Sequence, residues 1–321
     1  MTSFYERALP EGHSGFFSAP TPTLDPDLFT PGERLLPGVR DWLLNMLAGG
    51  LKKYLNLTGA EGWLHAWLAG SGITYQWSGD RGLTGDLDVL FGVDMIEFTR
   101  YNPEYQGVPE RNVADHVDQV LKRKLWPVTA HTRFGVREYE VTFFWNPGTG
   151  ADISRIHPYA AYDLLRDVWV VRPPQLPADP HALYPAEWYA AAGIDVDAAE
   201  QLARRHNTLK QRLSSTTLSE ASGRNAGAEL ARVRQSVMSL FDQIHGGRQA
   251  AFGEQGHGYS DWANFRWQAA KLHGIIGTLR AIIKEADEDK SVHVSQLYGG
   301  PIESAEVLLT RAMLHRKQDD R

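Results

Sequence analysis

The 321-residue chain contains no cysteine, no excess of positive charge and no long apolar run. The absence of cysteine excludes disulfide bonds, thiolate metal sites and cysteine nucleophiles. No stretch approaches the roughly eighteen apolar residues that a membrane span needs, so we expect no membrane association. The formal net charge is -6, which argues against a general attraction to nucleic acid but leaves room for a local basic groove.

The N-terminus also lacks the pattern of a secretory signal. Its first residues, MTSFYERALPEGHSGFF, include an acidic residue and a proline where a signal peptide needs an apolar run. We therefore expect a cytoplasmic protein. The histidines are scattered without the HExxH or paired spacing of zinc sites, so a zinc site is not expected.

Three regions of the chain differ in pattern. Residues 1–37 are rich in Pro, Gly, Ser and Thr, which favours an extended arm. Residues 38–175 mix short runs of period two with a few helical patterns, as is typical of an α+β domain. The proline-rich stretch 172–180 marks a boundary, and 181–321 has helical spacing almost throughout. We predict a mixed β-sheet flanked by helices, followed by an all-helical C-terminal domain.

Individual elements can be placed from the same periodicities. Strands are expected at 63–68, 87–93, 128–134, 138–145 and 168–171, and helices at 38–57, 112–123, 184–192, 195–214, 226–246, 260–286 and 302–316. The first helix contains Gly49 and Gly50, a pair at which it can break. Phe16, Phe17 and Phe29 indicate that the N-terminal arm lies against the body of the protein.

Two aspartates open the expected strand at 87–93. Asp86 and Asp88 alternate with Leu87 and Val89, so both carboxylates project from the same face, about 7 Å apart. Carboxylates at this separation repel each other unless a cation lies between them. Hard oxygen ligands without His or Cys suit Mg²⁺, and a pair of such ions supports two-metal chemistry.

A small-residue turn precedes the aspartates. Glycine lets the backbone approach a phosphate group closely, and successive amides with a serine hydroxyl can hold phosphate oxygens. Gly70 and Ser71 have this composition. A phosphate holder next to a metal pair indicates a nucleoside triphosphate as substrate.

A glycine-serine pair followed by Asp-x-Asp on a strand resembles the nucleotidyltransferase superfamily typified by DNA polymerase beta. The matching residues are Gly70, Ser71, Asp86 and Asp88. The resemblance covers roughly residues 60–160. The stretches 24–29, 70–77 and 158–164 are also similar to uncharacterised nucleotidyltransferases of actinobacteria and their phages. The family implies a nucleotidyltransferase-type sheet, a helical second domain, two Mg²⁺ ions and nucleotidyl transfer with release of pyrophosphate.

The resemblance further implies a third carboxylate on a later strand. Asp152 is the preferred candidate because it follows a strand and a glycine-rich turn, although it can equally cap the turn after Gly150. Glu140 is the second candidate. The segment between Ser71 and Asp86 is longer than the family pattern and holds a polar turn at 79–82.

Two features of the helical region have alternative interpretations. The basic residues Arg204, Arg205, His206 and Lys210 form either a solvated face or a contact for the triphosphate or the acceptor. The stretch 245–268 is rich in glycine and aromatic residues. Its aromatics can stack on a base, or they can fill the core, in which case Asn264 and Gln268 would lie on the helix surface.

Taken together, these features predict a magnesium-dependent nucleotidyltransferase. Asp86, Asp88 and Asp152 would hold two Mg²⁺ ions, while Gly70, Ser71 and Lys210 would bind the triphosphate. The acceptor is an RNA or tRNA end, a protein, a small molecule or a second nucleotide. The alternative is a catalytically silent protein that binds nucleotide or RNA as a sensor or accessory factor.

Overall fold

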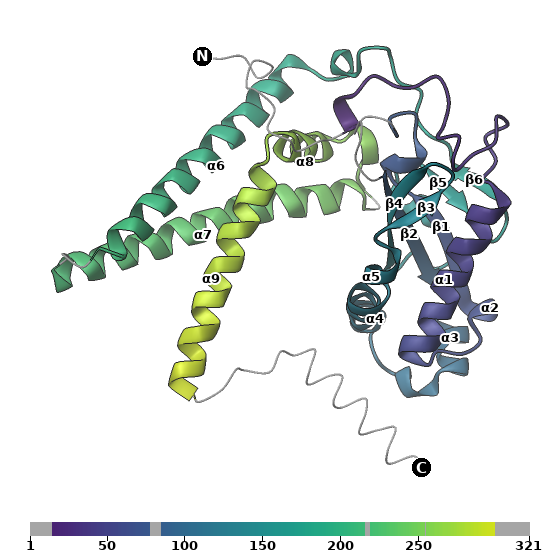
Figure 1. The fold of residues 1–321 in the computed structure, drawn as a ribbon, viewed down its shortest axis with the longest axis horizontal. Coiled ribbons are helices and arrows are strands. Elements are labelled where there is room, and N and C mark those ends of the chain that lie inside the picture. The colour runs from purple at the N-terminus through teal and green to yellow at the C-terminus, as the bar shows by residue number, and fades with distance from the viewer. Residues whose placement is uncertain (1–14, 78–84, 216–218, 254, 299–321) are drawn as a thin grey trace. The chain divides into compact units, whose positions relative to one another are not determined.

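The computed structural model describes residues 15–77, 85–215, 219–253 and 255–298 (Figure 1). The described chain forms two compact units, which meet in sequence between His181 and Ala182. The expected helix at 302–316 and the polar turn at 79–82 lie outside the described residues. None of the helices that are described has the length and apolar character required to cross a membrane.

The first unit is built on a six-stranded mixed sheet with the strand order β3-β4-β2-β1-β5-β6. The strands are β1 (Leu64–Ala69), β2 (Gly85–Val93), β3 (Thr132–Phe134), β4 (Arg137–Trp145), β5 (Ala161–Asp163) and β6 (Val168–Val171). Neighbouring strands are antiparallel except for β2 and β4, which run parallel. The predicted α+β class with a mixed sheet is confirmed.

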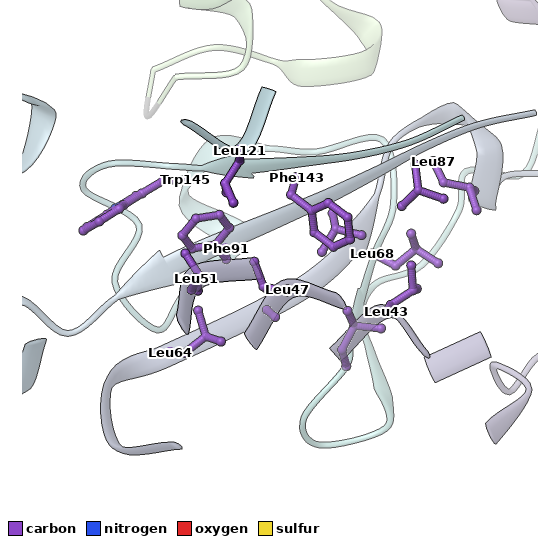
Figure 2. Packing of buried hydrophobic residues seen from close by; sticks show 14 of the residues in the cluster. Leu43, Leu47, Leu51, Leu64, Leu68, Leu87, Phe91, Leu121, Phe143 and Trp145 are labelled. Atoms are coloured by element: carbon purple, nitrogen blue, oxygen red, sulfur yellow. The ribbon is translucent and has the colours of Figure 1, made fainter. Parts of the chain in front are cut away.

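Helices α1 (Pro37–Leu55) and α4 (Glu110–Lys124) pack against the same face of this sheet. Figure 2 shows Leu43, Leu47 and Leu51 of α1 gathered with Leu87 and Phe91 of β2. These residues are at most 1% exposed, and burying each large apolar side chain stabilises the fold by about 1.5–3 kcal/mol. The hydrophobic core of the unit therefore lies between these helices and one face of the sheet.

The side chains of β2 alternate between the two faces of the sheet. Leu87, Val89 and Phe91 are buried in the core with α1 and α4. Because successive strand residues point to opposite faces, Asp86 and Asp88 project from the other face. The face of β2 that carries Asp86 and Asp88 is thus the one that α1 and α4 do not cover.

One helix is confirmed without the break that its glycines allow, and one expected strand begins later than predicted. Helix α1 continues through Gly49 and Gly50, and a Cβ at Gly50 would lie 2.8 Å from Leu125 Cδ2. The absence of a side chain there permits close helix packing instead of a break. The strand expected from 128 begins only at Thr132, since Pro127 lies in the first turn of the short helix α5 (Trp126–Thr129), where proline is favoured.

The segment before α1 is part of the sheet unit. Leu28, Phe29 and Leu35 are buried in its core. The buried Asp25 accepts a hydrogen bond from the Tyr139 hydroxyl of β4 at 2.8 Å. Asp27 accepts from two backbone amides of the β3–β4 hairpin, both at 3.0 Å. The proline-rich sequence thus forms turns and bends that are held against the sheet, instead of the extended arm that was expected.

The second unit contains helices α6 (Ala186–Leu213), α7 (Glu220–Ala251), α8 (Trp262–Leu272) and α9 (Ile275–Tyr298). The helical C-terminal region is therefore confirmed. Two expected helices, 184–192 and 195–214, form the single helix α6. The expected helix 260–286 is instead divided between α8 and α9 at Gly274, whose φ of 69° is a left-handed conformation that ends helices.

A buried carboxylate links α4 to the end of β4. Asp118 accepts a hydrogen bond from the Trp145 amide at 2.7 Å. Burial raises the pKa of Asp118 to about 7, and the backbone hydrogen bond opposes this only in part. The folded state then binds the proton more tightly than the unfolded state, so stability falls as the pH rises from about 4 to about 7.

The Asp118→Asn variant tests this linkage. Asparagine keeps an oxygen acceptor for the Trp145 amide but carries no charge. At pH 8 we expect the free energy of unfolding to rise by about 2–4 kcal/mol, with little change at pH 4. Urea unfolding at both pH values measures the effect. Asp41→Asn, at an exposed residue of α1, should change neither value appreciably. An equal effect of Asp118→Asn at both pH values would contradict the assignment.

Candidate functional site

The glycine-serine turn lies directly against the second aspartate. Strand β1 ends at Ala69, which is paired with Asp88 in the antiparallel register. Gly70 follows with a φ of 93°, a conformation that disfavours residues with a side chain. A Cβ at Gly70 would lie 3.1 Å from Asp88 Oδ2. The fold therefore brings together the two halves of the motif that the sequence separates.

The turn continues into the short 3-10 helix η2 (Ser71–Ile73). Ser71 is exposed, and its carbonyl oxygen accepts hydrogen bonds from the Thr74 amide at 3.1 Å and the Thr74 hydroxyl at 2.8 Å. A Cβ at Gly72 would overlap the backbone carbonyl oxygen of Asp86. Glycine at this position is thus what allows the turn to pack against the start of β2.

The two aspartates differ in their surroundings. Asp86 is exposed, whereas Asp88 is half-buried and accepts a hydrogen bond from the Thr142 hydroxyl at 2.8 Å. Thr142 is paired with Asp88 across the parallel β2–β4 register, so the two side chains share a face. The sequence did not single out Thr142, since only the register places it beside the motif.

The same register places Glu140 next to Asp86. The two residues are directly paired across β2 and β4 and project from the same face. Glu140 Oε1 accepts a hydrogen bond from Trp126 Nε1 of α5 at 2.8 Å, which fixes the direction of the carboxylate. Glu140, the second candidate for the third carboxylate, therefore lies on the strand adjacent to the aspartate pair.

Asp152 has a different position and different bonds. It begins the 3-10 helix η4 (Ile153–Ile156) and accepts hydrogen bonds from the Ser154 hydroxyl at 2.6 Å and the Ser154 amide at 3.0 Å. These two bonds lower the pKa of the exposed Asp152 carboxyl. Asp152 thus makes the turn-capping interaction that was the alternative to a catalytic role.

Asp86, Asp88 and Glu140 lie on the neighbouring strands β2 and β4, and the turn at Gly70 lies against Asp88. No family model, no curated protein and no solved structure matches the chain. Within the described residues, no group of three or more aspartate, glutamate or histidine side chains is gathered closely enough to hold a metal ion. What supports a function is therefore the placement of these residues on the sheet.

Lys210 belongs to an ion-pair network of the helical unit. Its Nζ lies 2.8 Å from Glu285 Oε2 of α9, and Arg234 Nη2 lies 2.8 Å from the other Glu285 oxygen. Burial acts to raise the pKa of Glu285, but the bonds from Lys210 and Arg234 outweigh it and lower the pKa. Lys210 therefore joins α6 to α9.

The other basic residues near Lys210 are also engaged within the unit. Arg204 pairs with Glu200 at 3.3 Å, and Arg205 pairs with Glu229 of α7. His206 was expected on the same face, but it is only 1% exposed. Helical spacing predicted that all four basic residues lie on one exposed face of α6. Packing within the unit buries His206 instead.

The segment before α1 forms hydrogen bonds with the residues that follow the glycine-serine turn. The buried Gln76 donates from Nε2 to the carbonyl oxygens of Phe16 at 2.7 Å and Ser18 at 2.9 Å. Trp77 Nε1 donates to the Thr23 carbonyl oxygen at 2.9 Å. These three hydrogen bonds hold the start of the segment between Ser71 and Asp86. The phenylalanines at 16 and 17 were the one sequence signal for this packing.

The aromatic stretch at 245–268 contributes to the core of the helical unit. Phe265 is 0% exposed and Trp267 is 6% exposed. Asn264 and Gln268, expected on the helix surface, are buried as well. Asn264 Nδ2 donates a hydrogen bond to the Tyr259 carbonyl oxygen at 3.0 Å, so the buried amide group has a partner inside the unit.

Proposed function

We propose that this protein is a metal-dependent nucleotidyltransferase of the DNA polymerase beta type. It would move a nucleoside monophosphate from a nucleoside triphosphate to an acceptor hydroxyl. The observation that carries the proposal is the contact between the Gly70 turn and Asp88, with Asp86 and Glu140 on the same face. A turn that can hold phosphate oxygens is thereby placed beside carboxylates that suit Mg²⁺.

Each residue has a distinct task in this proposal. Asp86 and Asp88 would hold the magnesium ions together with phosphate oxygens of the substrate, and bound Mg²⁺ would neutralise charge on the reacting phosphate groups. Glu140 would be the third carboxylate and would add its negative charge beside Asp86. Thr142 orients Asp88 through its hydroxyl. The exposed Ser71 and the neighbouring turn would bind the triphosphate. The acceptor hydroxyl would lose its proton to water as its oxygen forms a bond to the α-phosphorus. The bond to pyrophosphate would break at the same time, and pyrophosphate would leave with that electron pair.

The acceptor remains one of four classes: an RNA or tRNA end, a protein, a small molecule or a second nucleotide. The net charge of -6 disfavours a long nucleic acid, because neutralising many phosphates needs an excess of basic residues. A decisive experiment supplies each α-³²P-labelled triphosphate, Mg²⁺ and a bacterial extract to the full-length protein. Label should enter one fraction, namely RNA, protein or small product, and EDTA should abolish the transfer. Nucleotide binding without any transfer would instead support a silent sensor.

The same assay distinguishes the two candidates for the third carboxylate. We expect Glu140→Gln to lower the transfer rate by about a hundredfold or more, since glutamine keeps the bond to Trp126 but removes the charge beside Asp86. Asp152→Asn should retain most activity, because asparagine also caps helices. A large loss for Asp152→Asn with little loss for Glu140→Gln would reverse the assignment.

A further inference from the structure

Two arginines of the helical unit converge on one buried indole ring. The guanidinium carbon of Arg248, on α7, lies 5.1 Å from the centroid of Trp267. That of Arg280, on α9, lies 5.6 Å from the same centroid. Each arginine also lies 5.7 Å from a second ring, Phe252 for Arg248 and Phe241 for Arg280. The two guanidinium groups thus share one indole ring.

These two arginines differ from most others in the unit by their lack of a counter-charge. Arginines that pair with carboxylates are Arg204, Arg205, Arg224, Arg234 and Arg266. Neither Arg248 nor Arg280 forms an ion pair with any carboxylate in the described part of the chain. The Nε atom of Arg248 is buried without a hydrogen-bond partner there. Within the described residues, both positive charges are therefore in contact with aromatic rings and not with carboxylates.

The charges of both arginines also affect the pKa of a histidine that contacts the Trp267 ring. The His245 ring lies 5.5 Å from the Trp267 ring and stacks on Phe241 at 5.3 Å. Burial lowers the pKa of His245, and the charges of Arg280 and Arg248 lower it further, against the opposing effect of Asp242. The positive potential of both arginines is thus concentrated at one place, between α7, α8 and α9.

We propose that Arg248 and Arg280 form a phosphate-binding site supported by Trp267. A cation–π contact uses the face of the ring and the positive charge of the guanidinium, so it leaves N–H groups able to donate to phosphate oxygens. Arginine is well suited to this task, since its planar donors match two oxygens of one phosphate group. The group bound belongs either to a free polyphosphate or to a nucleic-acid strand. The site belongs to the helical unit alone and does not depend on the proposed transfer activity.

Binding assays with two probes test the site and distinguish its source of phosphate. The full-length protein is titrated in EDTA with inorganic tripolyphosphate by calorimetry, and with a fluorescein-labelled single-stranded RNA 12-mer by anisotropy. EDTA keeps metal-dependent binding at the aspartate pair out of the measurement. We expect at least one probe to bind, and Arg248→Gln with Arg280→Gln to raise its Kd about tenfold or more.

The matched control is Arg232→Gln. Arg232 is an exposed residue of α7 and its replacement removes the same charge from the same helix. It should change the Kd less than twofold. If the double variant does not fold, as judged by circular dichroism, the exposed Arg280→Lys provides the test, because lysine keeps the charge and loses the planar donors. Binding of neither probe to the wild-type protein would overturn the proposal, as would equal Kd values for the wild type and the arginine variants.

Discussion

Asp88→Asn is expected to reduce magnesium-dependent nucleotide transfer by about a thousandfold or more. Asparagine has the size of aspartate, and its oxygen can still accept the hydrogen bond from Thr142, so the strand should keep its structure. What disappears is the charge that would hold Mg²⁺ beside the Gly70 turn. The transfer rate at saturating triphosphate and Mg²⁺ measures the loss, and thermal unfolding should shift little.

Asp94→Asn provides the matched control for this variant. Asp94 follows β2 directly and caps helix α3 (Met95–Tyr101) by accepting from the amides of Ile96 at 3.0 Å and Glu97 at 3.2 Å. Asparagine caps helices equally well, so this variant removes one negative charge close to β2 without disturbing the fold. It should retain wild-type activity. Similar losses for both variants would mean that general charge, and not a metal site, explains the effect.

Gly72→Ala should lower both stability and activity. The added methyl group would overlap the carbonyl oxygen of Asp86, a backbone atom that cannot move aside as a flexible side chain can. We expect a loss of about 3 kcal/mol in the free energy of unfolding of the sheet unit, at the upper end of the usual cost of overpacking. Because relief of the overlap requires the turn to move away from β2, transfer activity of the folded fraction should fall as well.

The corresponding control is Gly49→Ala in α1. Nothing lies within 4 Å of the position that its Cβ would take, and alanine is the better helix former. This substitution should raise the free energy of unfolding by about 0.5–1 kcal/mol and leave activity unchanged. Both glycines belong to the same unit, so urea unfolding followed by tryptophan fluorescence reports on one common transition. A harmless Gly72→Ala would show that the turn does not need its close approach to Asp86.

Local pattern was sufficient to predict the part of the site that depends on a single strand. The alternation of Asp86 and Asp88 with Leu87 and Val89 indicates both a strand and the face that the carboxylates share, because side-chain direction has a period of two. The glycine-serine pair indicates a tight turn, because glycine adopts backbone conformations that other residues disfavour. These predictions need no knowledge of which strands are neighbours.

The choice between Asp152 and Glu140 as the third carboxylate cannot be made from a local pattern in this way. Glu140 lies beside Asp86 because β2 and β4 pair in parallel, and that pairing connects segments about fifty residues apart. The sequence favoured Asp152 over Glu140, since Asp152 follows a strand and a glycine-rich turn. Its hydrogen bonds to Ser154 were equally consistent with the sequence, but a local pattern does not determine which of the two roles a residue takes.

Tertiary packing also explains why some residues do not follow their intrinsic preferences. Gly50 would interrupt an isolated helix, yet contact with Leu125 makes its lack of a side chain useful in α1. Asn264 and Gln268 are polar, yet they are buried in the helical unit. In each case the residue type gives the intrinsic preference, and packing against a distant segment reverses it.

The separation of the two faces of β2 has a consequence for how such a protein can evolve. Leu87, Val89 and Phe91 maintain the core with α1, while Asp86 and Asp88 are turned away from it. Substitutions on the face of the sheet that carries Asp86 and Asp88 can therefore alter the proposed activity with little loss of stability. New substrates could be acquired by substitutions on that side while the opposite side, and with it the fold, stays the same.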